Sequence, residues 1–120
     1  MSDYQLGAVE AKFADIIWEN EPISSPELVR KSAEVLRWKK STTYTVLKRL
    51  CGKGIFQNQK GVVTSLLSRQ EFYALQSENF VKENFNGSLP AFLAAFSSRQ
   101  NLTDRDVALL RRMVEEYEEE

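Results

Sequence analysis

The chain of 120 residues contains no histidine and only one cysteine, Cys51. The absence of histidine removes the most common general base and the most common metal ligand, and one cysteine cannot form an intramolecular disulfide. No apolar run approaches the roughly 20 residues that a membrane-spanning helix needs. Paired carboxylates and glycine-rich phosphate loops are missing too. We therefore expect no enzyme, metal site, cofactor or membrane insertion, and a cytoplasmic location without a secretion signal.

Charge is distributed unevenly, although the net charge is only −1. Residues 1–68 carry ten basic and seven acidic residues, whereas residues 69–120 carry six basic and ten acidic ones. No acidic residue lies between Glu34 and Glu71, and this acid-free stretch holds eight lysines and arginines. A basic island in a mildly acidic protein is typical of a surface that binds nucleic acid.

Three helices are predicted in the first half of the chain, because apolar residues recur there at helical spacing. Ser25 followed by Pro26 is a strong helix start, and Ser41 is the expected cap of the third helix. Gly54 is suited to the left-handed conformation that ends a helix. The expected helices span about 6–19, 26–35 and 42–52.

A β-hairpin is predicted after the third helix. Two β-prone runs, 55–59 and 62–67, flank the turn formed by Lys60 and Gly61, and Ile23–Ser24 is a candidate short strand. Three helices followed by a hairpin is the order of a winged helix-turn-helix, whose third helix enters the major groove of DNA while the wing contacts the backbone or the minor groove. The predicted fold is mainly α with this small hairpin.

The last third of the chain predicts three more helices, over about 70–85, 89–96 and 104–117. They are apolar but too short to enclose a core of their own, so burial against a second copy of the chain is expected. We therefore divide the chain into a DNA-binding domain, 1–69, and a helical dimerisation segment, 70–120. The expected dimerisation residues are Phe72, Leu75, Phe80, Val81, Leu89, Phe92, Leu93, Phe96, Val107, Leu110, Val114 and Tyr117.

Candidate DNA contacts gather on the third helix and the wing. Three threonines in one helical turn are unusual for a helix chosen only for stability, and their hydroxyls and methyls suit phosphates and thymine methyls. Lys48 and Arg49 are expected to contact guanine edges or phosphates, because no acid nearby in the sequence pairs with them. Other lysines are expected on phosphates. The full set is Lys39, Lys40, Ser41, Thr42, Thr43, Tyr44, Thr45, Lys48, Arg49, Lys53 and Lys60.

Several of these residues have a simpler interpretation as well. Thr43 is also explained by capping with partial burial, and charged residues such as Lys48 often only face solvent. Trp18 and Trp38 suit base stacking in principle, but each adjoins an apolar face, so we expect them in the core. Cys51 is expected to be a buried small side chain rather than a redox switch.

An ordered set of motifs resembles the penicillinase repressors of the BlaI/MecI type. It comprises Ile16–Ile17–Trp18–Glu19, then Trp38, the run Thr42–Thr43–Tyr44–Thr45–Val46–Leu47–Lys48–Arg49–Leu50, Lys53–Gly54, Ser77–Glu78–Asn79–Phe80, Gly87–Ser88–Leu89 and Leu102–Thr103–Asp104. The resemblance covers nearly the whole chain. It implies a homodimeric repressor of resistance genes on a dyad operator in double-stranded DNA.

The same resemblance implies a route of induction. In the family, a membrane sensor-transducer for β-lactams triggers proteolysis within the dimerisation segment, and by position the candidate cleavage point here is Ala95–Phe96. Staphylococcal members have asparagine where this chain has Ala95, and the residue after the wing glycine, often arginine in the family, is Val62 here. A copper-responsive branch carries cysteine motifs near the C-terminus that this chain lacks.

One alternative from another functional class stays open at this point. A winged helix also serves as a protein-interaction module, in which case the basic face would dock an acidic protein partner. The density of threonine, lysine and arginine on one helix favours DNA, and steep salt dependence of binding to duplex DNA would separate the two hypotheses.

Overall fold

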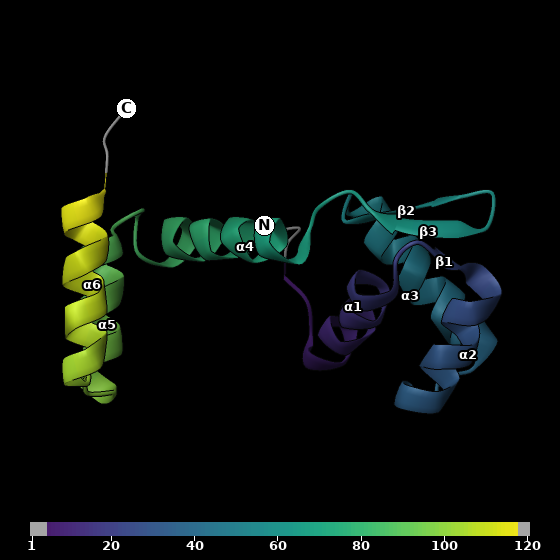
Figure 1. Ribbon diagram of the computed structural model, residues 1–120, viewed down its shortest axis with the longest axis horizontal. Coiled ribbons are helices and arrows are strands. Elements are labelled where there is room, and N and C mark those ends of the chain that lie inside the picture. The colour runs from purple at the N-terminus through teal and green to yellow at the C-terminus, as the bar shows by residue number, and fades with distance from the viewer. Residues whose placement is uncertain (1–4, 118–120) are drawn as a thin grey trace. The chain divides into compact units, whose positions relative to one another are not determined.

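The computed structural model describes residues 5–117, which form two compact units that divide between Asn79 and Phe80 (Figure 1). The elements are α1 Ala8–Asn20, β1 Ile23–Ser24, α2 Ser25–Leu36, α3 Lys40–Gly52, β2 Phe56–Gln59, β3 Val62–Ser65, α4 Arg69–Asn84, α5 Leu89–Arg99 and α6 Asp104–Glu116.

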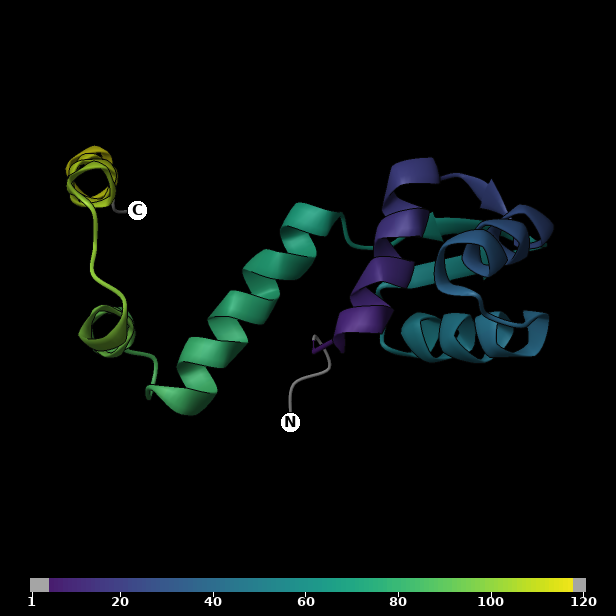
Figure 2. The same cartoon turned by 90° about the horizontal axis from the view of Figure 1, so that it is seen from below.

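The first unit is a three-helix cluster with a small antiparallel sheet of order β1-β3-β2. Helices α1, α2 and α3 gather against the sheet, as Figure 2 shows. Fully buried side chains from every layer, including Phe13, Leu28, Leu50 and Val63, form one continuous core. Burial of these apolar side chains is the main term that holds the unit together. The predicted mainly α winged-helix fold is confirmed.

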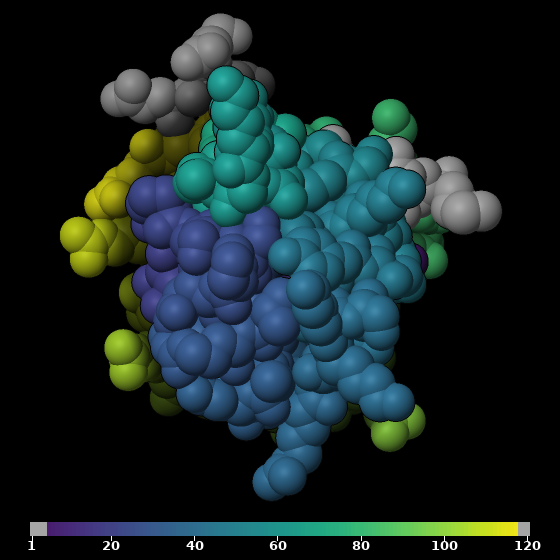
Figure 3. Space-filling view, turned by 90° about the vertical axis from the view of Figure 1, so that its right-hand side faces the viewer, coloured from purple at the N-terminus to yellow at the C-terminus, as the bar shows by residue number. Residues whose placement is uncertain are grey.

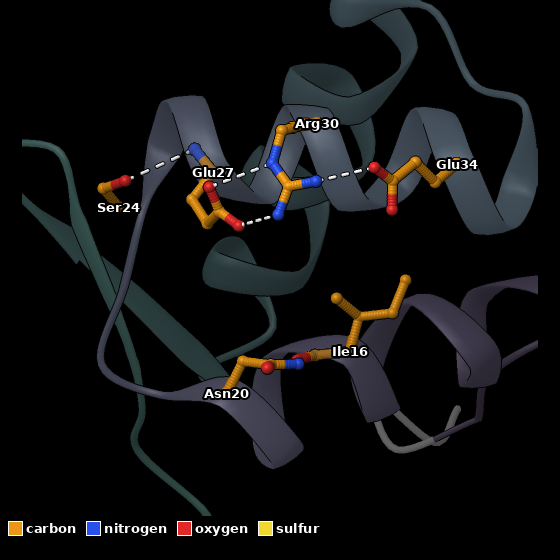
Figure 4. Close-up of polar contacts among 6 residues, drawn as sticks. All are labelled: Ile16, Asn20, Ser24, Glu27, Arg30 and Glu34. Carbon is orange, nitrogen blue, oxygen red and sulfur yellow. Dashed lines mark hydrogen bonds and ion pairs between the residues drawn. The ribbon is translucent and has the colours of Figure 1, made fainter.

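Helix α2 begins one residue earlier than the sequence pattern predicted. The cap is Ser24, whose hydroxyl accepts the N–H of Glu27, and not Ser25 (Figure 4). Ser25 is buried instead, and its N–H and hydroxyl both donate to the carbonyl of Gly61, at 2.8 and 3.2 Å. Ser25, which the sequence pattern predicted as the cap, therefore links the start of α2 to the turn of the wing through these two hydrogen bonds.

The start of α3 also differs from the prediction. Lys39 occupies the cap position without a side-chain hydrogen bond, and Ser41 lies inside the helix. The end of α3 agrees with the prediction, because Gly54 has a φ of 79° and its N–H donates to the carbonyl of Cys51. Glycine adopts this left-handed conformation without steric cost.

The wing is the predicted hairpin. Lys60 and Gly61 have φ values of 54° and 83°, the pair of positive angles that a tight two-residue hairpin turn needs. Strands β2 and β3 pair from Phe56 opposite Ser65 to Gln59 opposite Val62. The predicted strand Ile23–Ser24 is present as β1 and pairs with the other side of β3.

Glu21 clamps the chain between α1 and β1 to the end of β3. Its carboxylate accepts the N–H of Ser65 at 2.8 Å and lies 2.8 Å from the Ser65 hydroxyl through either oxygen. No local sequence pattern indicates this contact, because the partners are 44 residues apart.

We expect Glu21→Ala to lower the free energy of unfolding by about 1–3 kcal/mol, because a partly buried N–H and a hydroxyl lose their charged acceptor. Urea unfolding of the full chain measures this. Glu19→Ala is the matched control. Among the described residues Glu19 forms a single ion pair, exposed, with Arg69 at 3.3 Å, so its loss should cost less than about 1 kcal/mol. Equal losses from the two substitutions would contradict the clamp.

The beginning of α4 belongs to the first unit. The Trp18 indole N–H donates to the carbonyl of Leu67 at 3.0 Å, and Phe72 packs against the Trp18 ring with 5.6 Å between centroids. The Arg69 guanidinium lies 5.7 Å above the same ring and pairs with Asp15. The predicted boundary at residue 69 therefore falls inside a packed region, and the first unit continues to Asn79.

Phe72 is a correction to the predicted dimerisation set. Its side chain has no exposed surface within this single chain, so it has none left to offer a second copy. The helical spacing correctly placed Phe72 on the apolar face of α4. That face packs against Trp18 near the start of the helix and against Phe92 near its end, through Phe80. The tryptophans behave as expected for core residues, since Trp38 packs on Phe13 at 5.1 Å.

The second unit contains the end of α4 with α5 and α6. Phe80, Phe85 and Phe92 form an aromatic cluster with centroids 5.6–6.1 Å apart. Asn86 and Gly87, both with positive φ, separate α4 from α5 as predicted. Thr103 caps α6 by accepting the N–H of Asp106. Every helix in the described part of the chain is too short or too polar to span a lipid bilayer.

Candidate nucleic-acid interface

The exposed face of α3 carries most of the predicted DNA contacts. Val46, Leu47 and Leu50 are buried on the opposite face. An α-helix places residues three and four apart on one side, and the polar residues of α3 follow this spacing. The exposed members of the predicted set on or beside α3 are Lys39, Lys40, Ser41, Thr42, Thr45, Lys48 and Arg49.

Thr43 is a second correction. Its side chain is fully buried, and its hydroxyl donates to the carbonyl of Lys39 at 3.3 Å, so the side chain has no surface with which to touch DNA. Tyr44 is half-buried and packs against the core. Thr45 is exposed, and its hydroxyl donates to the Ser41 carbonyl at 2.9 Å, which leaves its methyl group and oxygen lone pairs toward solvent.

Most lysines of this face make no ion pair. Among the described residues, no ion pair includes Lys39, Lys40, Lys48 or Lys60. The positive charges therefore remain available to an anionic partner. Acids of the same unit are used elsewhere: Glu27 and Glu34, for example, both pair with Arg30 on α2 (Figure 4).

Arg49 is the exception, and it corrects the argument from local sequence. Glu10, at the first turn of α1, accepts the Arg49 Nη1 donor at 2.6 Å. Lys53 donates to the backbone carbonyl of Gln5 at 3.2 Å. Burial opposes ionisation of Glu10, but the Gly7 N–H and the Arg49 guanidinium together hold the pKa of its carboxyl below the usual range. The stretch of sequence around Arg49 is acid-free, but its surroundings in space are not.

The wing reaches the surface beside the helices. Figure 3 shows the hairpin tip, in teal, projecting above the blue surface of α2 and α3. Lys60 lies exposed in the turn, and Val62 is 44% exposed just after it. Asn58 accepts the N–H of Gly61 at 3.1 Å, which helps to hold the turn closed. Helix α3 and this basic turn belong to one compact unit.

Cys51 lies at the end of α3. It is half-buried, packs against the core, and burial raises the pKa of its thiol. A thiol whose pKa is raised is mostly protonated at neutral pH and reacts slowly with oxidants. Cys51 therefore has the surroundings of a packing residue.

In the second unit the apolar side chains of α5 and α6 are exposed and form no buried core. Neither α5 nor α6 has a buried residue. An open apolar hollow of about 360 Å³ lies between them, lined chiefly by Phe92, Leu93, Phe96, Leu102, Leu109 and Leu110. The predicted dimerisation residues Phe80, Leu89, Phe96, Val114 and Tyr117 are 44–76% exposed. The others, Leu75, Val81, Phe92, Leu93, Val107 and Leu110, are partly exposed.

Two exposed apolar residues of α6 were missing from the predicted set. Leu109 is 48% and Met113 68% exposed. The adjacent pairs Leu109–Leu110 and Met113–Val114 were the available signal, since they widen the apolar stripe beyond a narrow seam. The candidate cleavage residues Ala95 and Phe96 lie inside α5, with both side chains exposed.

A compact unit of three helices and a hairpin, with unpaired cations on the third helix, defines a winged-helix DNA-binding protein. The model of the family described as "Penicillinase repressor" matches residues 6–116. The chain therefore belongs to the penicillinase repressor family, whose members are DNA-binding transcriptional repressors.

Curated relatives match along nearly their whole length. The "Penicillinase repressor" of Bacillus licheniformis is 23% identical over 117 residues, which cover 94% of this chain and 91% of the relative. The "Methicillin resistance regulatory protein MecI" of Staphylococcus aureus strain Mu50 is 22% identical over 115 residues, covering 92% and 94%. The protein of that name from Mammaliicoccus sciuri is 21% identical over 115 residues, with the same coverage.

Proposed function

We propose that this protein is a homodimeric transcriptional repressor that binds a palindromic operator in double-stranded DNA and controls genes of the β-lactam resistance type or related genes. The observation that carries the proposal is the exposed face of α3, where Thr42 and Thr45 present uncharged polar side chains and Lys48 has no ion-pair partner among the described residues. The names of the relatives and the family match support the regulated class of genes.

The contacts divide into two kinds. Thr42, Thr45 and Lys48 follow one another at three-residue spacing along the exposed face and would reach base edges when α3 enters the major groove. Lys39, Lys40 and Lys60 flank that face at its start and on the wing, where they would neutralise phosphates. Ser41 and Lys53 lie at the two ends of the helix and suit phosphate contacts as well. The first kind supplies sequence preference and the second supplies affinity.

The second unit would join two copies. Its apolar residues are too exposed for an isolated chain, and burying them against the same surface of another copy removes apolar area from water. Two recognition helices would then lie about one helical turn of DNA apart (~34 Å) or a multiple of it, on a pseudo-palindromic site. The joined pair binds more tightly than either half because the second contact becomes intramolecular.

Release from DNA would follow from cutting or disrupting the second unit. The family resemblance suggests a cut at Ala95–Phe96, triggered through a membrane sensor-transducer for β-lactams. This bond lies in the middle of α5 (Leu89–Arg99), and proteolytic nicking favours exposed loops over regular helices. A protease would therefore have to unwind α5 first, which is feasible because α5 has no buried residue.

Selection of duplexes from a random-sequence library with the purified full chain tests the proposal, followed by gel shifts at several salt concentrations. We expect a dyad sequence whose binding weakens steeply with salt. Failure to enrich any sequence, together with weak and sequence-indifferent binding, would contradict the proposal and favour docking of an acidic protein partner on the basic face.

Two substitutions separate the proposed roles on the selected duplex. Lys48→Ala should relax base preference at one position of each half-site, with a loss of about 1–3 kcal/mol there. Lys60→Ala should weaken binding to all sequences evenly and reduce the salt slope by about 1. Arg105→Ala, an equal change of charge on α6, should change neither. Identical effects of Lys48→Ala and Lys60→Ala on every sequence would refute this division.

A further inference from the structure

Glu10 is an acid that contacts the predicted recognition helix from another element. It lies at the first turn of α1, 39 residues before Arg49, and its Oε2 is 2.6 Å from the Arg49 Nη1. Among the described residues, no other ion pair joins an acid to α3. The face of α3 therefore combines free lysines with one arginine whose charge is already balanced.

Glu10 is the less exposed partner of this pair and holds the more exposed Arg49. The Glu10 side chain is 21% exposed, against 51% for Arg49. Its other oxygen, Oε1, accepts the Gly7 N–H at 3.2 Å, so both carboxylate oxygens are engaged. Arg49 uses one of its five N–H donors on Glu10 and keeps the others on its exposed part.

This pairing has two consequences for binding to a polyanion. A balanced arginine adds little to the long-range attraction of phosphates, which depends on net positive charge and is independent of sequence. An arginine whose plane is held in place also loses less side-chain entropy when it makes a bidentate contact. The balanced charge therefore weakens sequence-independent binding to DNA. The fixed orientation of the guanidinium favours a bidentate contact with one particular base.

We propose that Glu10 is a specificity-determining residue, which positions and neutralises Arg49 so that this arginine contributes to recognition of the operator but not to sequence-independent binding of DNA. The proposal rests on the proposed function, since it assumes that the face of α3 meets DNA. A role confined to folding is a weak alternative, because an exposed ion pair contributes at most about 1 kcal/mol.

Glu10→Gln in the full chain is the direct test. Glutamine can still accept the Gly7 N–H, so the start of α1 should remain capped. The probes are a duplex selected with the wild-type chain and a scrambled duplex of equal length and composition. We expect binding to the scrambled duplex to tighten about threefold to tenfold at low salt, with a salt slope steeper by up to about 0.9, because one more phosphate is neutralised. Binding to the selected duplex should change less, so the ratio of affinities falls.

The matched control is Glu34→Gln, which makes the same charge change in an exposed ion pair with Arg30 on α2. It should leave the ratio of affinities within twofold of wild type. Thermal unfolding followed by circular dichroism establishes that both variants are folded at the temperature of the assay. An equal fall of the ratio in the two variants, or an unchanged ratio in Glu10→Gln, overturns the proposal.

Arg49→Ala supplies a second, independent readout. If Glu10 neutralises Arg49, removing the arginine lowers binding to the selected duplex but does not flatten the salt slope on the scrambled one, unlike Lys60→Ala. In the Arg49→Ala background, Glu10→Gln should have no further effect on the ratio. A slope reduced by about 0.9 in Arg49→Ala alone would overturn the proposal. Failure of the wild-type chain to select any duplex would refute the proposed function itself, and is thus distinguishable.

Discussion

Val114→Asp on α6 is expected to convert the proposed dimer into monomers and to weaken binding to a two-half-site operator by about 10²- to 10⁴-fold. Val114 is 76% exposed and borders a hollow lined also by Leu102, Val107 and Leu110. The substitution removes little packing from the single chain, whereas in the proposed dimer it buries an unpaired carboxylate in an apolar contact. Without the partner, each winged helix binds its half-site alone and the gain from tethering is lost.

Sedimentation equilibrium measures the oligomeric state, and gel shifts on one and two half-sites measure the binding. Arg105→Ala is the matched control: it makes the same change of net charge, and nine residues from Val114 along an α-helix it faces the opposite side. We expect this control to stay dimeric. The half-site affinity of Val114→Asp should equal that of wild type. A Val114→Asp chain that remains dimeric would show that α6 does not form the contact.

Phe72→Ala is expected to lower the free energy of unfolding of the first unit by about 3–5 kcal/mol while leaving the association of two chains intact. Phe72 is fully buried against Trp18, so its removal leaves a cavity in the core as well as losing the transfer free energy of the ring. Domains of this size have only about 5–15 kcal/mol of stability in total. Urea unfolding followed by tryptophan fluorescence measures the loss.

Tyr73→Ala is the control for this substitution. Tyr73 follows Phe72 in α4 and contacts the same tryptophan at 6.3 Å, but it is 39% exposed. We expect Tyr73→Ala to cost about 1 kcal/mol, because less apolar area leaves water on folding. If Phe72→Ala weakens the association of two chains under conditions where the first unit remains folded, Phe72 takes part in dimerisation after all.

The order of elements followed from local information. Apolar spacing predicted the helices, and the Lys60–Gly61 turn predicted the hairpin, because these signals act between residues only a few positions apart. The cap of α2 shows the limit of such signals, because the sequence pattern predicted Ser25 and the structure has Ser24. Both serines suit a cap, and the choice depends on the Gly61 carbonyl, which lies 36 residues away and holds Ser25.

The existence of α3 was easier to predict than which of its side chains are exposed and which form ion pairs. Periodicity placed Thr42, Thr45 and Lys48 on one side, as the structure has them. It did not separate the buried Thr43 from its exposed neighbours, since a threonine suits either environment. It also had no means of finding Glu10, because an ion pair across 39 residues leaves no trace in local composition.

Local sequence was thus enough to decide that the chain forms a winged helix with a basic third helix and an apolar helical segment after it. The reason is that periodicity, turn residues and runs of charge are properties of neighbouring residues. Tertiary packing alone decided that Phe72 completes the first core, that Glu21 clamps β3 and that Glu10 balances Arg49. These contacts join residues dozens of positions apart, and they exist only once the helices have taken their places around a common core.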